Sequence, residues 1–163
     1  MNPALLIIDL QEGHIPGPRK RGEVEEVCQY INYVSNLFRD AGKPIVVIQD
    51  IEIEGGIDSE DFAVIPEIEL TGGELILHKE WSNAFWKTNL EEVLRQEGVD
   101  FVIVCGFAAE HCVTFTYNGA KERGFGAAYL QNGLLGEHPN AVQAITEVRP
   151  LISYPVIASI LKS

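Results

Sequence analysis

Residues 101–130 read FVIVCGFAAEHCVTFTYNGAKERGFGAAYL, and this stretch decides the fold class. It opens with a short, continuous apolar run, Phe101–Val104, and closes with a second one, Gly126–Leu130. Strands that are buried on both faces of a sheet have this pattern. Residues 112–123 between them have a helical pattern, which Gly124 ends. The stretch therefore predicts a parallel βαβ unit.

The same alternation of apolar runs and helical patterns extends in both directions along the chain. The 163 residues suit one domain. We predict a single α/β domain over residues 1–163, a three-layer α/β/α sandwich whose parallel sheet has about six strands. The other expected strands are Ala4–Ile8, Pro44–Ile48, Glu74–Leu77 and Leu151–Ser153, and the other expected helices lie at 24–41, 90–97, 140–148 and from Pro155 onward.

Composition excludes several classes of protein. Twelve Lys and Arg stand against 24 Asp and Glu, and the formal net charge is −12. Such a chain repels phosphate backbones and anionic lipids, so we expect neither a nucleic-acid partner nor a membrane partner. Three cysteines without a CxxC spacing favour reduced thiols. The N-terminal apolar run is too short for a signal peptide, and we expect a cytoplasmic protein.

One segment, Ile51–Gly73, interrupts the alternation. It carries seven acidic residues, no Lys or Arg, and two Gly-Gly pairs. Ligands of open α/β sheets bind at the carboxyl ends of the strands. The segment follows such an end, so it either walls a binding site or forms a solvated acidic loop.

Three chemically active side chains follow predicted strands. Asp9 closes the run LLII, Lys79 follows ELILH, and Cys112 opens the helix after FVIVCG and the turn FAAEH. A charged residue at the end of a buried strand needs a partner, so these residues favour one shared site. A helix N-terminus and a nearby lysine both lower a thiol pKa, and a carboxylate can accept its proton. The alternative is that Cys112 is a buried, inert cysteine.

Three separated stretches resemble one protein family. IIDLQ, HKEWSNAFWKTNLEEVL and VCGFAAEHCVTFTYNGAKERGF are similar to the signature stretches of the isochorismatase-like cysteine hydrolases, which include nicotinamidases and N-carbamoyl amidohydrolases. The resemblance implies strand order 3-2-1-4-5-6 and a catalytic triad of Asp9, Lys79 and Cys112. It also implies a cis peptide bond between Phe107 and Ala108, with the amides of Ala108 and Cys112 forming an oxyanion hole.

The sequence departs from the family pattern near the expected pocket. His14 stands where many members have Phe. Either His14 makes one wall of the pocket polar, or it is a residue of a surface loop. Ala109 and Glu110 replace a common Thr-Asp pair. The candidates for the substrate pocket are Gln11, His14, Phe85 and His111.

Metal and nucleotide sites are disfavoured. Nicotinamidases carry an Asp-x-His pair after the second strand, whereas here Asp50 is followed by Glu52, and the four histidines are scattered. The first turn, DLQEGHIPG, lacks the glycine fingerprint of dinucleotide-binding folds. We therefore expect no metal and no cofactor. The one basic cluster, residues 19–21, is either a solvated loop or a contact for an anionic substrate.

The prediction from the sequence is a hydrolase of the carboxamide or carbamoyl C–N bond of a small molecule, acting through a cysteinyl thioester. One alternative is the vinyl-ether hydrolysis that isochorismatases perform. The other is a non-catalytic binding or assembly protein that retains the fold. Resemblance to the family also implies a homo-oligomer, a dimer or a tetramer.

Overall fold

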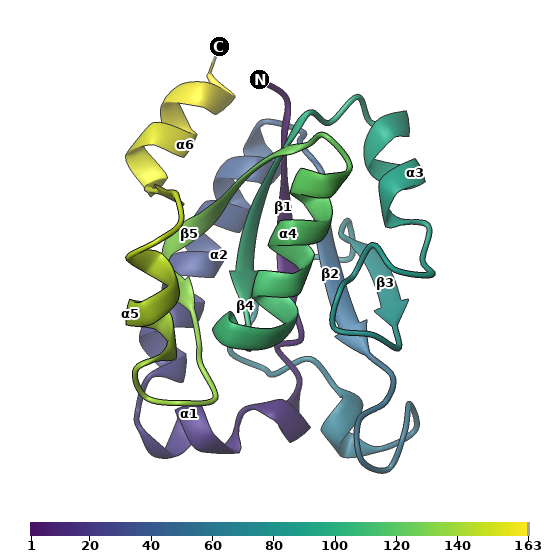
Figure 1. Ribbon diagram of the computed structural model, residues 1–163, viewed down its shortest axis with the longest axis vertical. Coiled ribbons are helices and arrows are strands. Elements are labelled where there is room, and N and C mark those ends of the chain that lie inside the picture. The colour runs from purple at the N-terminus through teal and green to yellow at the C-terminus, as the bar shows by residue number, and fades with distance from the viewer. Residues whose placement is uncertain (163) are drawn as a thin grey trace.

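Six parallel strands form one sheet in the order β3-β2-β1-β4-β5-β6, which confirms the predicted order (Figure 1). The structure is a computed structural model that describes residues 1–162. Its strands are β1 (Pro3–Ile8), β2 (Ile45–Asp50), β3 (Leu75–Lys79), β4 (Phe101–Gly106), β5 (Gly126–Leu134) and β6 (Leu151–Ile152). Their carboxyl ends lie along one edge, at the bottom of the view in Figure 1.

Helices cover both faces of the sheet, as predicted. Residues of α2 (Val24–Asp40) and α6 (Tyr154–Leu161) pack into one apolar core, and residues of α3 (Leu90–Gln96), α4 (Thr114–Glu122) and α5 (Ala141–Thr146) pack into or against the other. The strands contribute alternate residues to the two cores, so that Leu5 lies in the first and Leu6 in the second. β1 is fully buried because it lies in the middle of the sheet between β2 and β4.

Two local features differ from the prediction. The helix expected to open at Cys112 begins instead as a π-helical turn, Ala109–Val113, in which His111 leaves helical backbone angles, and α4 follows from Thr114. A short helix, α1 (Pro16–Lys20), was not predicted, because five residues with two prolines carry no apolar periodicity.

The acidic segment 51–73 does not line the cavity described below, and six of its seven acidic residues are exposed, as expected of a solvated acidic loop. Its backbone bridges to β1's extension through Val64 and Gln11, and Ile65 and Ile68 are buried in the first core. It backs the site instead. A Cβ atom added to Gly13 would lie 2.8 Å from Asp61 and from Ile53, so these two residues support the turn after β1 from behind.

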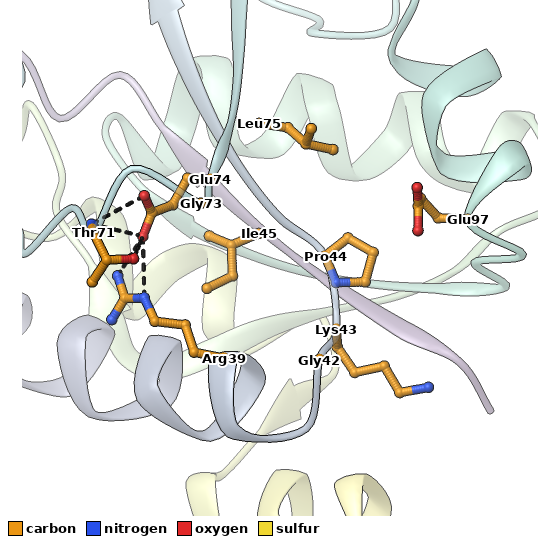
Figure 2. Close-up of a pocket in the computed structure, with 10 residues that line it drawn as sticks. All are labelled: Arg39, Gly42, Lys43, Pro44, Ile45, Thr71, Gly73, Glu74, Leu75 and Glu97. Atoms are coloured by element: carbon orange, nitrogen blue, oxygen red, sulfur yellow. Dashed lines mark hydrogen bonds and ion pairs between the residues drawn. The ribbon is translucent and has the colours of Figure 1, made fainter.

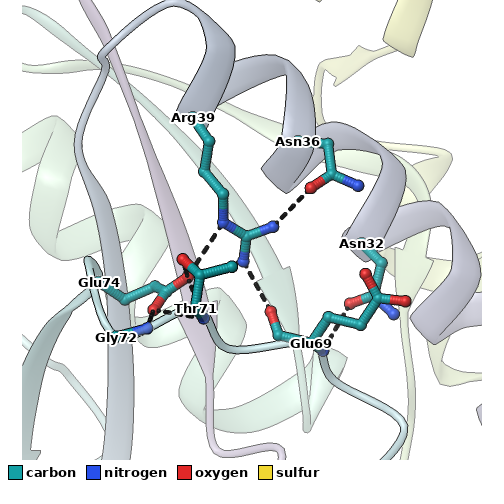
Figure 3. A network of polar contacts seen from close by, with 7 residues as sticks. All are labelled: Asn32, Asn36, Arg39, Glu69, Thr71, Gly72 and Glu74. Carbon is teal, nitrogen blue, oxygen red and sulfur yellow. Dashed lines mark hydrogen bonds and ion pairs between the residues drawn. The ribbon is translucent and has the colours of Figure 1, made fainter.

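A polar network joins the end of this segment to α2. The Glu74 carboxylate, whose side chain is 2% exposed, accepts hydrogen bonds from the Arg39 guanidinium, from the backbone amides of Thr71 and Gly72 and from the Thr71 hydroxyl (Figure 3). These donors lower the pKa of Glu74 to about 2, although burial alone would raise it. Arg39 also donates to Asn36 and to the Glu69 carbonyl.

This network borders a cavity of about 370 Å³ at the amino ends of β2 and β3 (Figure 2). Three of its four charged lining residues have side-chain partners: Arg39 binds Glu74, and Lys43 donates to the Asn2 side chain. The cavity lies at the opposite edge of the sheet from Asp9 and Lys79, and its lining holds no thiol or histidine.

Candidate active site

Asp9, Lys79 and Cys112 meet at the carboxyl edge of the sheet. The Lys79 ammonium lies 2.8 Å from Asp9 Oδ2 and 3.5 Å from Cys112 Sγ. Asp9 follows β1 with a left-handed backbone (φ 48°), Lys79 is the last residue of β3, and Cys112 lies in the turn after β4. The structure therefore brings together the three residues that the sequence singled out.

A glycine allows the close approach of β1 and β4 that this site needs. Gly106 has φ 109°, and a Cβ atom there would overlap the Ile8 carbonyl. Without a side chain, the end of β4 packs directly on β1, and Phe107 N donates to Ile8 O at 2.9 Å. The nucleophile turn thus starts beside the residue that precedes Asp9.

Asp9 and Lys79 form a buried ion pair. Their exposed fractions are 1% and 2%. Burial raises the pKa of Asp9, although the Lys79 charge opposes it, and the net pKa of Asp9 is raised. Burial disfavours the charge on Lys79, but Asp9 and Cys112 outweigh it and the pKa of Lys79 is raised. A carboxylate with a raised pKa is a better proton acceptor than a solvated one.

The thiol pKa is shifted in the direction opposite to the sequence-based expectation. Burial and the Asp9 charge together raise the pKa of Cys112 to about 12, and Lys79 only partly opposes them. The expectation was wrong because it counted the helix terminus and the lysine but not burial or the carboxylate. This raised pKa favours the neutral thiol over the thiolate.

The backbone around Cys112 leaves one amide without a hydrogen-bond acceptor among the described residues. The peptide bond between Phe107 and Ala108 is cis. Ala109 N donates to Leu135 O, and His111 N and Val113 N both donate to Ala108 O. Among residues 1–162, Ala108 N has no such acceptor, and it lies on the cavity wall beside Cys112.

A cavity of about 400 Å³ opens on the thiol. That volume suits a small molecule. His14 forms one side with its ring stacked on Phe107, the centroids 5.8 Å apart, and His111 forms another. The complete lining is Asp9, Gly13, His14, Gly17, Pro18, Phe107, Ala108, His111, Cys112 and Glu137.

Asp50 links His14 to the ion pair. Its Oδ2 lies 3.7 Å from His14 Nε2 and 3.9 Å from Lys79 Nζ. Burial opposes ionisation of Asp50, but His14 and Lys79 outweigh it, so that its pKa is lowered. In the sequence, Asp50 stood out only because no histidine follows it at the spacing of the nicotinamidase metal motif, and its contact with Lys79 was missed because it depends on the pairing of β2 with β3.

One group of three side chains has the chemistry of a cation site. Asp9, His14 and Asp50 bring a ligand atom each to within 4.8 Å of one another. The Lys79 ammonium already contacts both carboxylates of this group. A dication there would face the repulsion of that buried ammonium, so we regard Lys79 as the cation that the carboxylates hold.

Two of the pocket candidates do not line the cavity. Gln11 is fully buried and exchanges hydrogen bonds with the Asp50 backbone, while its amide also donates to Phe62 O. Phe85 packs on Phe125 in the second core. Gln11 is a structural tie between β1 and β2, whereas His14 and His111 face the cavity as expected.

The sequence reasoning missed Glu137. It lines the cavity and lies 3.2 Å from His111 Nε2, although it is far from the other site residues in the chain. No motif marks it. Its place becomes visible only because β5 pairs with β4 and returns the following loop to the nucleophile turn.

Among the described residues, no helix has the length and apolar character needed to cross a bilayer.

Comparison with known proteins gave a match to the isochorismatase domain model over residues 3–153. The isochorismatase family protein YddQ of Bacillus subtilis is 30% identical over 132 residues, which cover 77% of this chain and 73% of YddQ.

Two further relatives carry names that state an activity. Maleamate amidohydrolase of Pseudomonas putida is 26% identical over 166 residues, 87% of this chain and 76% of that protein. The crystal structure of N-carbamoylsarcosine amidase from Thermoplasma acidophilum is 26% identical and superposes with a TM-score of 0.78, covering 94% of this chain and 95% of that one.

Proposed function

Because the chain belongs to the isochorismatase family of hydrolases, we propose that it hydrolyses the carboxamide or carbamoyl C–N bond of a small molecule through a cysteinyl thioester. One observation carries the proposal: a buried ammonium contacts a carboxylate and a thiol at the floor of a cavity. That arrangement supplies a nucleophile, a proton acceptor and a fixed positive charge.

The acylation step follows from the protonation states of the site. Asp9 removes the thiol proton as Cys112 Sγ attacks the carbonyl carbon of the substrate. The amides of Ala108 and Cys112 hold the negative charge that develops on the carbonyl oxygen. Protonated Asp9 then donates its proton to the leaving nitrogen, the C–N bond breaks, and a thioester remains on Cys112.

Deacylation uses the same carboxylate. Asp9 accepts a proton from water, whose oxygen attacks the thioester carbonyl, and the C–S bond breaks to release the acid. The proton returns to Cys112 Sγ, so that the resting thiol is restored. Lys79 keeps its charge throughout and stabilises whichever of Asp9 and Cys112 is anionic.

The relatives support the amide as the bond class. Maleamate amidohydrolase and N-carbamoylsarcosine amidase are named for C–N hydrolysis, and both match most of this chain. They do not fix the substrate, because the cavity wall contributed by residues 13–18 and 135–139 lies outside the three motif stretches quoted from the sequence.

A screen of small primary amides and carbamoyl compounds for release of ammonia tests the proposal. The wild-type protein should release ammonia from at least one compound, and mass spectrometry of quenched reactions should find the acyl group on Cys112. Cys112→Ala should reduce turnover to background. Cys28→Ala is the matched control, since Cys28 is buried in the first core, and it should retain activity.

Two results would overturn the proposal. The first is undiminished amide turnover by Cys112→Ala, which would show that Cys112 is not the nucleophile. The second is cleavage of isochorismate by both wild type and Cys112→Ala with no ammonia released from any amide, which would favour the vinyl-ether reaction, since that reaction needs no acyl-enzyme.

A further inference from the structure

Residues 135–139, here called the wall segment, follow β5 and reach the cavity through Glu137. Glu137 is the wall residue that lines the cavity, and its carboxylate contacts His111, the neighbour of the nucleophile. Both side chains are more than half exposed, so this contact cannot by itself hold the segment in place. Something else must position it.

The beginning of the wall segment is tied to the nucleophile turn by its backbone. Leu135 N donates to Gly106 O at 2.9 Å, and Ala109 N donates to Leu135 O at 2.8 Å. Leu135 therefore bonds to the residues on both sides of the Phe107–Ala108 peptide. The following residues leave the sheet and need other partners for their backbone groups.

Glu110 supplies partners for two backbone amides. Its Oε1 accepts a hydrogen bond from His138 N at 2.8 Å, and its Oε2 accepts one from Glu137 N at 3.3 Å. Glu110 lies in the π-helical turn, two residues before Cys112. The turn that carries Cys112 is thus hydrogen-bonded to the wall segment through the Glu110 carboxylate.

Arg21 binds the carbonyls of the same peptides from the opposite side. Its guanidinium donates to Gly136 O at 2.6 Å and to Glu137 O at 3.2 Å, while Glu23 fixes its third nitrogen at 2.9 Å. Arg21 follows α1, which carries the cavity-lining residues Gly17 and Pro18. The basic cluster of the sequence is therefore a structural contact at this residue, and not a solvated loop.

The wall segment packs closely at Gly136, where a side chain would have no room. A Cβ atom at Gly136 would lie 2.9 Å from Ala141 Cβ and 2.9 Å from His138 O. The segment is thus packed against α5 on one side and held by two charged side chains, remote in the sequence, on the others.

We propose that Glu110 and Arg21 are positioning residues that fix the wall segment, and with it the His111–Glu137 pair, at one distance from Cys112. This inference rests on the proposed function. The carboxylate meets backbone N–H groups and the guanidinium meets backbone C=O groups, so each charge has the partner it requires. Neither side chain lines the cavity, and both act on the substrate through the wall.

The first test separates binding from chemistry. Glu110→Gln and Arg21→Met should each raise KM about tenfold, the worth of one charge-assisted hydrogen bond, with kcat changed less than about twofold. The KM of the double variant should not exceed the higher KM of the two single variants, because either loss frees the same segment. Glu110→Asp, which keeps the charge, should raise KM less than Glu110→Gln does.

The matched control is Glu91→Gln. Glu91 also pairs with two arginines, Arg95 and Arg123, but on the surface of α3. It should leave KM unchanged. The inference is overturned if KM does not move in either single variant, or if the effects of Glu110→Gln and Arg21→Met multiply in the double variant.

A second measurement needs no substrate, so that failure of the inference and failure of the proposed function remain distinguishable. Hydrogen exchange of the Glu137 and His138 amides should accelerate about tenfold or more in Glu110→Gln, and also in Arg21→Met, relative to Glu91→Gln. Unchanged protection in both variants contradicts the inference even if amides are hydrolysed. Faster exchange without any amide turnover contradicts the proposed function alone.

Discussion

Two buried carboxylates at opposite edges of the sheet, Asp9 and Glu74, have pKa values shifted in opposite directions. Each pairs with a basic side chain at a similar distance, 2.8 Å from Lys79 and 2.7 Å from Arg39. Glu74 also accepts hydrogen bonds from backbone amides and a hydroxyl, and its pKa is lowered to about 2. Asp9 lacks such donors, and burial raises its pKa.

The difference shows what separates a structural ion pair from a reactive one. A carboxylate that accepts several hydrogen bonds is stabilised in its charged form and takes up a proton only at low pH. Asp9 takes up a proton more readily, because burial raises its pKa. The cavity beside Glu74 therefore borders a fold-stabilising contact, and the cavity beside Asp9 is where we propose that hydrolysis takes place.

The largest expected effect comes from removing the reactive charge. Asp9→Asn should cut amide turnover about 10²–10⁴-fold, the usual contribution of a positioned acid–base group. Alkylation of Cys112 should be as fast as in wild type or faster, because the Asp9 charge raises the thiol pKa. Parallel assays of ammonia release and iodoacetamide labelling check this. If both rates fall together, Asp9 supports structure and not proton transfer.

Removing the structural charge should affect stability and not turnover. Glu74→Gln should lower the free energy of unfolding by about 1.5–3 kcal/mol, since hydrogen bonds to a charged group are lost. Denaturant unfolding of this variant, beside turnover at neutral pH, measures both. Glu91→Gln, an exposed pair, should change stability by less than about 1 kcal/mol.

The same carboxylate predicts a pH dependence. The pKa of Glu74 is about 2 in the folded state and 4.5 when unperturbed. Its contribution to stability is therefore complete above pH 4.5 and is lost as the pH falls toward 2. The stability difference between wild type and Glu74→Gln should shrink over that window. A constant difference would show that shape, and not charge, carries the effect.

A smaller effect is expected for the ammonium. Lys79→Met should raise the pKa of the Cys112 thiol further, because Lys79 is the charge that opposes burial and Asp9 there. Alkylation at pH 7 should slow about tenfold or more. The pH profile of labelling in wild type and variant measures it. An unmoved profile would mean that the 3.5 Å contact carries no electrostatic coupling.

The smallest expected effect is that of chelation. The Lys79 ammonium already contacts the carboxylates of Asp9 and Asp50, so they need no metal ion to balance their charge. Turnover should therefore survive exhaustive treatment with a metal chelator. The control is re-addition of zinc or iron, which should not stimulate the enzyme. Loss and recovery of activity would show that a cation displaces Lys79 from these carboxylates.

Much of this arrangement followed from the sequence because local patterns encode it. The strand order, the positions of the strands and the meeting of Asp9, Lys79 and Cys112 were predicted from apolar runs and three motifs, and the sheet order is confirmed. Strand ends place residues reliably, since the backbone of a paired strand leaves little choice of position.

The remainder depends on contacts between distant segments. The raised thiol pKa could not be predicted because it reflects burial and the Asp9 charge together. No motif marks Glu137, and Arg21 stood out only as part of the basic cluster 19–21, since the carbonyls that it binds are backbone groups that any sequence supplies. Gln11 appeared in a motif and was taken for a pocket residue, although its amide ties β1 to the backbone of Asp50.

The central place of β1 has a consequence for how the chain is made. β1 is synthesised first, yet one of its two neighbours, β4, begins only at Phe101. Until β4 emerges, one edge of the fully apolar strand Ala4–Ile8 stays without a partner. Unpaired apolar edges are where nascent chains associate, and long-range parallel pairing is slow. Refolding yield should therefore fall as protein concentration rises, and a charged substitution within β1 that lessened association would also remove the strand that places Asp9.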